Sequence, residues 1–100
     1  MNKHYKEIAE VVIPAHDGEE SLTTLHIFDV TDEKANELYD IGYPTKRSEW
    51  NALAVADAIC EDLMAYDDGC VAPGAPFHRY SARFGFPHTV YLLDTLAYNV

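Results

Sequence analysis

Two kinds of hydrophobic periodicity divide this chain of 100 residues and limit what it can fold into. Near both ends, β-branched and aromatic residues alternate with other residues, which is typical of strands. The expected strands cover residues 5–14, 22–30, 78–86 and 88–100. The last of these also carries a stripe that fits a helix. The middle of the chain has a helical period, over residues 32–41 and 49–69. The order ββααββ predicts an α+β domain, with two helices on one face of an antiparallel sheet of about four strands.

Residues that begin or end secondary structure support this order. The sequence HDGEES between the first two strands is turn-forming, so these strands are expected to form a hairpin. Thr31 is a good N-cap for the first helix, and Gly42 ends it. Ser48 and Gly69 are the predicted limits of the second helix. Because the sequence shows no repeat and no linker, residues 1–100 are expected to form a single domain.

The balance of charge is strongly acidic, with 17 Asp and Glu against 7 Lys and Arg and a formal net charge of −10. Such a charge repels the phosphates of nucleic acids and anionic membrane surfaces, and it attracts basic partners. The chain is therefore expected to bind neither nucleic acid nor membranes directly. Its longest apolar runs are far too short to span a bilayer.

The N-terminal sequence and the cysteine content bear on location. The first residues, MNKHYKEIAE, contain no apolar segment of the kind found in a secretory signal. Two cysteines without an export signal indicate free thiols in a reducing compartment. We therefore expect a cytoplasmic protein.

The second predicted helix carries charge of a single sign. Residues 49–69 contain six acidic residues and no basic one, and Lys and Arg are absent from residues 48–78. On a helical wheel one side is apolar, and the opposite side carries Trp50, Asp57, Glu61, Met64 and Asp68. Asp67 and Asp68 also lie at the negative end of the helix dipole, which is unfavourable for carboxylates. Such a conflict with helix electrostatics is a pointer to function.

Two interpretations of the acidic helix remain open. Its carboxylates either form a solvated face, neutralised by basic residues elsewhere in the fold, or bind a basic partner. In the second interpretation Trp50 is an apolar anchor, and the acids imitate the phosphates of DNA. Trp50 could equally cover the edge of the sheet as part of the core. The candidate partner-binding residues are Trp50, Asp57, Glu61, Met64, Asp67 and Asp68, with Glu33 and Glu37 on the first helix. The expected partner is a basic surface on a host protein that handles nucleic acid.

In size, acidity and lack of catalytic motifs, the chain is similar to the small inhibitors that phages use against host defences, the anti-CRISPR and antirestriction proteins. The likeness is one of type and involves no shared motif. It implies a stoichiometric, phage-encoded inhibitor that occupies a basic nucleic-acid channel by imitating DNA.

Residues suited to other chemistry are present without a recognised pattern. The two cysteines and the last two histidines are separated by nine, seven and nine residues, unlike the close ligand pairs of zinc sites. His26, or His78 with Asp94, has the chemistry for acid–base catalysis, but no nucleotide-binding or nucleophile motif accompanies them. We predict no catalytic residue, no metal and no cofactor, and therefore no enzyme.

Two further functions remain as alternatives. Arg79 and Arg83 are expected on one face of a strand, about 13 Å apart. There they could bind an anion such as a nucleotide, as part of a small-ligand-binding module. Pairing with the surplus carboxylates of the same chain competes with this function. The chain could instead be a plain interaction or assembly domain, with a homodimer formed through an exposed sheet edge.

Overall fold

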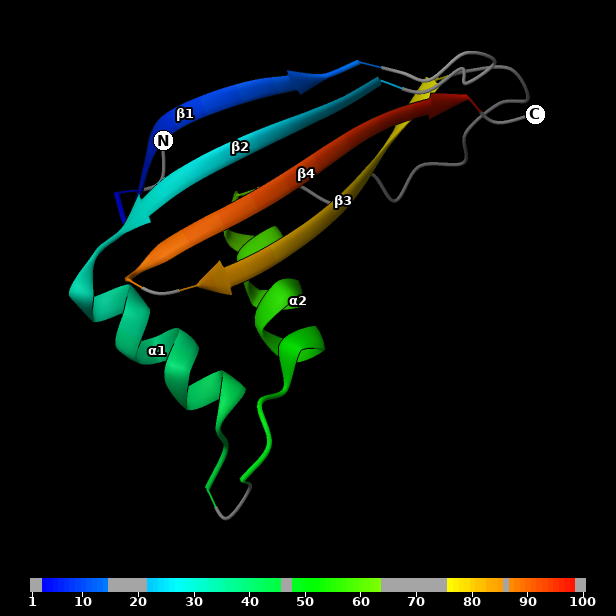
Figure 1. Cartoon of the computed structure of the whole chain (residues 1–100). Helices are drawn as coiled ribbons and strands as arrows, with labels where there is room; N and C mark the ends of the chain where they lie inside the picture. The colour runs from blue at the N-terminus through cyan, green and yellow to red at the C-terminus, as the bar shows by residue number, and fades with distance from the viewer. Residues whose placement is uncertain (1–2, 15–21, 46–47, 64–75, 86, 99–100) are drawn as a thin grey trace.

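The computed structural model describes residues 3–14, 22–45, 48–63, 76–85 and 87–98. Its elements follow the order ββααββ, and the predicted α+β class is confirmed. Four antiparallel strands form a single layer, and both helices lie on the same side of it (Figure 1). The strands are β1 (Tyr5–Ile13), β2 (Leu22–Val30), β3 (Pro76–Gly85) and β4 (Thr89–Tyr98). The helices are α1 (Asp32–Gly42) and α2 (Ala52–Leu63).

The strands lie in the order β1-β2-β4-β3, so β2 and β4 are central and β1 and β3 form the edges. The C-terminal segment that fits either a strand or a helix in the sequence is strand β4. Because β4 pairs with both β2 and β3, its backbone groups find partners on two sides, which favours the strand. A bulge between Glu7 and Ala9 interrupts the β1–β2 ladder and leaves Ile8 without an opposite residue on β2.

The core lies between the helices and one face of the sheet. All six elements contribute buried residues to it: Tyr5, Val30, Ala35, Leu38, Val55, Ile59, Phe84 and Val90. Val55 and Ile59 lie four positions apart on α2, as the predicted apolar helix face requires. Full burial of a large apolar side chain contributes about 1.5–3 kcal/mol, so this cluster is a main source of stability.

Helix α1 is limited by the residues that the sequence predicts. The Thr31 hydroxyl accepts a hydrogen bond from the backbone N–H of Lys34 at 3.3 Å, which confirms Thr31 as the N-cap. The helix ends at Gly42, which is buried against the ring of Trp50. A Cβ at position 42 would lie 2.0 Å from this ring, so the close approach of the two residues requires glycine.

The start of α2 differs from the prediction. The helix begins at Ala52, and the Asn51 side chain caps it by accepting a hydrogen bond from the N–H three positions later, at 3.2 Å. Ser48 is therefore not the N-cap. The Asn51 N–H bonds to the Gly42 carbonyl at 2.8 Å, so the end of α1 fixes where α2 can begin. This tertiary contact has no counterpart in the local sequence pattern.

Trp50 precedes α2, and its predicted place on the acidic face of the helix is wrong. The helical wheel treated residues 49–51 as part of the helix, although α2 begins at Ala52. The wheel therefore placed the Trp50 ring on the side of the helix opposite to the core. The indole packs against Tyr39, Tyr43 and Phe84, with ring centroids 4.9 to 6.5 Å apart. Trp50 therefore packs against the core beside α1 and β3.

Candidate protein-binding surface

One face of the sheet is covered in part by the helices, although Val12 and Leu22 at one end of it are exposed, and the other face is open. Phe84, Val90 and Leu92 are buried on the covered face. Because side chains alternate along a strand and paired residues share a face, the register assigns the alternate positions to the open face. The predicted alternation of β3 agrees with this assignment, since Phe84 is buried and Arg83 is exposed.

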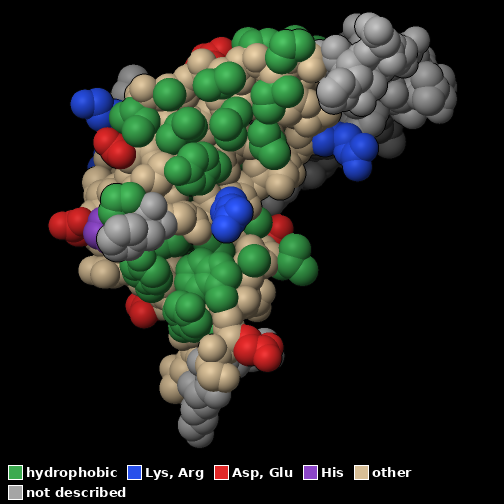
Figure 2. Space-filling model, viewed as in Figure 1, with side chains coloured by type: hydrophobic (Ala, Val, Ile, Leu, Met, Phe, Trp, Pro, Cys, Tyr) green, Lys and Arg blue, Asp and Glu red, His purple; other side chains and the backbone are tan. Residues whose placement is uncertain are grey.

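The open face is mainly apolar at its centre. Its central row runs across all four strands through Val11, Leu25, Leu93 and Ser81. The next row contains Ala9, Ile27, Tyr91 and Arg83. The most exposed apolar residues here are 36% to 47% accessible, namely Val11, Ile13, Tyr91 and Leu93. Figure 2 shows hydrophobic side chains gathered over the strands on this face. This exposed apolar surface is the candidate site of interaction.

The charged residues of the open face are basic on balance. Those assigned to it are the cations Lys6, Arg79 and Arg83 and the carboxylate of Asp29. The face therefore contrasts with the chain as a whole, whose net charge is −10. Arg79 and Arg83, the predicted anion-binding pair, are exposed, and each borders a different shallow depression. The structure does not bring the two guanidinium groups into one enclosed site.

Small residues hollow the open face along β3. A depression of about 640 Å³ is lined in part by Gly85, Ser81 and Leu93. A smaller one of about 260 Å³ also borders Ser81 and Leu93. At the other edge of the same face, β1 carries the β-branched side chains of Val11 and Ile13, which are 47% and 41% exposed. The open face is thus bulky at Val11 and Ile13 on β1, and along β3 it is hollowed at Ser81 and Gly85, beside Arg79 and Arg83.

The acidic residues predicted to bind a partner lie on the helices, away from the open face. Glu33 and Glu37 on α1, and Asp57 and Glu61 on α2, are exposed. Lys34 is the single Lys or Arg within the two helices, and it is buried. Within the bounds of α1 and α2, the helices therefore present carboxylates and no exposed Lys or Arg, and one of these carboxylates, Glu37, pairs with Lys34. The other predicted residues of this set, Met64, Asp67 and Asp68, lie outside the described residues.

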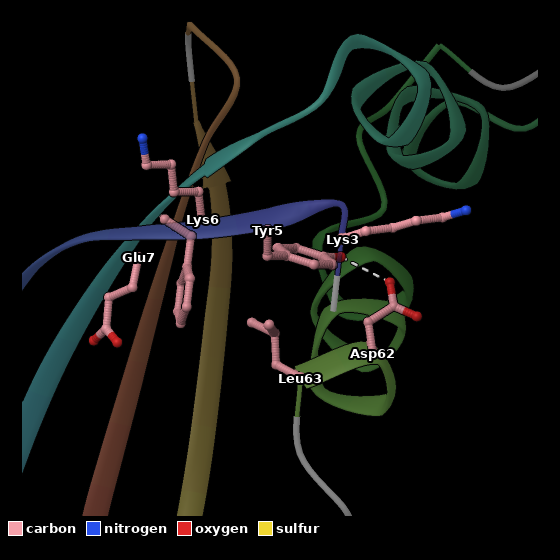
Figure 3. A pocket seen from close by; sticks show the side chains of 7 residues that line it. Lys3, Tyr5, Lys6, Glu7, Asp62 and Leu63 are labelled. Atoms are coloured by element: carbon pink, nitrogen blue, oxygen red, sulfur yellow. Dashed lines mark hydrogen bonds between the residues drawn. The ribbon is translucent and has the colours of Figure 1, made fainter. Parts of the chain in front are cut away.

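Lys34 joins α1 to α2, and it was not among the residues that the sequence singled out. Its Nζ forms ion pairs with Asp62 on α2 and, at 3.1 Å, with Glu37 on α1. The Tyr5 hydroxyl donates a hydrogen bond to the same Asp62 carboxylate at 2.7 Å (Figure 3). Burial opposes the charge of Lys34, but its bonds to both carboxylates outweigh this effect and raise its pKa. Burial, with the bond to Asp62, also raises the pKa of Tyr5.

Tyr5 and Asp62 border a depression of about 800 Å³ at the start of β1 and the end of α2 (Figure 3). Lys3 and Glu7 add polar groups to its lining, and Leu63 adds an apolar one. Tyr5 is held in its protonated form, and Asp62 already binds two donors. The geometry therefore suits a junction that fastens the helices to the sheet better than it suits a catalytic base.

Two histidines pair with carboxylates on the sheet. Nδ1 of His78 lies 2.7 Å from Asp94, the pair that the sequence suggested for acid–base chemistry. Nδ1 of His26 lies 2.6 Å from Glu7, and the bulge in β1 turns Glu10 to the same face. The ligand atoms of Glu7, Glu10 and His26 lie within 4.8 Å of one another, which is part of a ligand set for a divalent cation. Both glutamates are exposed, and the set alone does not make a metal site.

Comparison with protein-family models, with curated proteins and with solved structures finds no match for this chain. In the part of the chain that the structure describes, neither helix is long and apolar enough to cross a lipid bilayer. Two surfaces distinguish the molecule: an apolar sheet face with basic side chains, and an acidic helix layer on the opposite side.

Proposed function

We propose that the protein acts by binding a protein chain, and that the open face of its sheet is the interface. The observation that carries this proposal is the central row of the open face, which is apolar on β1, β2 and β4 and ends at Ser81 on β3. Strand β4 is apolar on both faces, with Val90 and Leu92 in the core and Tyr91 and Leu93 on the open face. Strands that are apolar on both faces are typical of sheets covered on both sides. A partner on the open face would provide the second cover.

A second proposal assigns the acidic helix layer to a basic partner. Exposed carboxylates on both helices support it, because the single cation of these helices is buried against Asp62 and Glu37. On this proposal the protein is a cytoplasmic, phage-encoded inhibitor of the anti-CRISPR or antirestriction type. It would block a basic nucleic-acid channel of a host protein by imitating DNA. Electrostatic steering would make its association fast and sensitive to salt.

Affinity capture from a host lysate at low and high salt separates these proposals. The baits are the wild type, the open-face variant Leu93→Lys, and a helix variant with Asp57, Glu61 and Asp68 changed to Lys. Leu53→Lys is the matched control, because Leu53 is 79% exposed on α2. Binding through the open face is expected to survive high salt and to be lost in Leu93→Lys. Binding through the helices is expected to be lost in high salt and on charge reversal.

The oligomeric state of each bait is measured in parallel, so that binding to its own copies is also counted. Binding that persists in both the Leu93→Lys and the charge-reversed protein would contradict both proposals. A protein that binds neither a lysate component nor itself would contradict the first. The anion-binding hypothesis is tested separately by a thermal-shift screen with nucleotides, in which any stabilisation should disappear in Arg79→Ala.

A further inference from the structure

We propose that the chain covering the open face is a second copy of this protein, so that two sheets pack face to face in a symmetric homodimer. This inference rests on the proposed use of the open face as a protein interface. Three properties of the face support it: its layout relative to a twofold axis, the separation of charge in the resulting dimer, and its size.

The strand order gives the face a natural twofold axis. In the order β1-β2-β4-β3, an axis that lies in the interface between β2 and β4, parallel to the strands, exchanges β2 with β4 and β1 with β3. Two copies related by this axis would place each β1 over the β3 of the other copy. Each β2 would lie over the β4 of the other copy, to within the roughly 30° angle of aligned sheets.

At the sheet edges, this axis pairs a bulky residue with a small one in the two central rows. A rotation about an axis parallel to the strands does not change the position of a residue along its strand. The row that contains Val11 and Ser81 therefore packs against the same row of the partner, with the order of the strands reversed. Val11 then lies over the partner's Ser81, and Leu25 lies over the partner's Leu93. In the next row Ala9 lies over the partner's Arg83. Val11 thereby faces the depressions beside Ser81, whereas Ile13, two residues further along β1, lies over the partner's Arg79.

The same axis keeps the arginines of the two copies apart. Arg79 and Arg83 both lie on β3, which would face β1 of the other copy and not its own counterpart. Lys6 on β1 would lie at the level of the partner's Gly85, one row from the partner's Arg83. An axis perpendicular to the strands would instead stack β3 on β3 and bring the arginines together. The acidic helices lie on the outer side of each sheet, so the dimer holds the two helix layers roughly 30 Å apart. That separation exceeds the Debye length of about 8 Å at physiological salt, and the net charge of −10 per copy is largely screened across it.

The size of the face is at the lower limit for a specific pair. Four strands spaced by about 4.8 Å, each about eight residues long at 3.3 Å per residue, cover roughly 500 Å² of flat area per copy. The two copies together would bury about 1,000 Å² before the relief of the side chains is counted, which reaches the lower range of specific interfaces. The apolar central row would then lie fully inside the interface, as the buried centre of a homodimer does.

Light scattering after size-exclusion chromatography tests the inference on the full chain. The wild type is expected to elute at about twice its 11.3 kDa mass at high concentration and to dissociate on dilution. Leu93→Lys and, independently, Val11→Lys are expected to be monomeric with unchanged circular dichroism. The matched control Leu53→Lys is expected to remain dimeric. A dimer that persists in both open-face variants would overturn the inference in favour of another contact, such as a sheet edge.

Cross-linking tests the axis without relying on disruption. In a Cys70→Ser background, chains carrying Val11→Cys are mixed with chains carrying Ser81→Cys and treated with a short bismaleimide. The mixture is expected to give covalent dimers, and either variant alone is expected to give few. Equal cross-linking in all three samples would overturn the proposed axis. A wild type that is monomeric at every concentration would overturn the homodimer, whereas Leu93-dependent capture of another protein would still uphold the proposed function.

Discussion

Lys34 on α1 and Asp62 on α2 form an ion pair that ties the two helices together on the covered side of the sheet. The Lys34 side chain is only 7% exposed, and that of Asp62 is 27% exposed. Asp62 also accepts the hydrogen bond of Tyr5, so one carboxylate connects α1, α2 and β1. A buried charge held in this way is costly to leave without its partner.

Replacing Lys34 with Met is expected to destabilise the protein by about 2 kcal/mol. Loss of one member of a fully buried pair costs 3–5 kcal/mol, and the partial exposure of Asp62 reduces this figure. Urea denaturation at neutral pH measures the change. The double variant Lys34→Met/Asp62→Asn should recover part of the loss, because it removes the unpaired carboxylate. Lys6→Met is the control at an exposed lysine, and an equal loss there would contradict the role assigned to Lys34.

Stability is expected to fall as the pH rises above about 10. Tyr5 and Lys34 have raised pKa values in the folded protein, so the unfolded chain loses these protons first, near the ordinary values of 10.0 and 10.5. The stabilisation is complete below those values and is lost with increasing pH, at up to about 1.4 kcal/mol per pH unit for each proton retained on folding. Urea unfolding between pH 7 and 11 measures the slope. Tyr5→Phe should make it shallower, and an unchanged slope would count against this assignment to Tyr5.

The Cys60 thiol is expected to react slowly with thiol reagents while the protein is folded. Cys60 is 5% exposed, and burial, followed by the nearby charge of Asp57, raises its pKa. Both effects lower the amount of accessible thiolate, which is the reactive form. In a Cys70→Ser protein, a chromogenic disulfide reagent at pH 8 should modify Cys60 slowly in the folded state. It should modify Cys60 rapidly once urea has unfolded the protein. Equal rates in the two conditions would show that the thiol is not protected.

Gly42→Ala is expected to destabilise the protein by about 2 kcal/mol, because the new methyl group would overlap the Trp50 ring at 2.0 Å. Trp50 is the single tryptophan of the chain, so a shift in its fluorescence should report the displaced ring directly. Gly85→Ala is the matched control, since its Cβ would meet the Tyr91 ring at an ordinary 3.4 Å. A loss of stability at Gly85 as large as at Gly42 would indicate a general effect of losing glycine.

The fold followed from the sequence because its signals are local. Alternation identified β1, β2 and β3, and the Thr31 cap and the terminal Gly42 set α1 correctly. The start of α2 was missed because a hydrogen bond from Asn51 to the carbonyl of Gly42, in another element, fixes it. Such contacts override a plausible local cap such as Ser48.

The candidate surface was harder to foresee, although the sequence does contain a signal. Val90 to Leu93 are consecutive apolar residues, and a strand with both faces apolar is expected to be covered on both sides. The prediction relied instead on the run of acidic residues without Lys or Arg, and it therefore selected Asp57 and Glu61. The role of Lys34 could not be read from charge alone, because its partner Asp62 lies on a different helix.

Ile8 has no partner on β2, so β1 can lose one residue at this position without a change in its pairing. Deleting Ile8 would leave Glu7 opposite Phe28 and Ala9 opposite Ile27, which is the pairing that already exists. Every other side chain of β1 would keep its present face, because the deletion removes the residue that interrupts the alternation. Single-residue shortening at this point should therefore be accepted during evolution. Deletion of one residue elsewhere in β1 would move the side chains on one side of the deletion to the opposite face of the sheet.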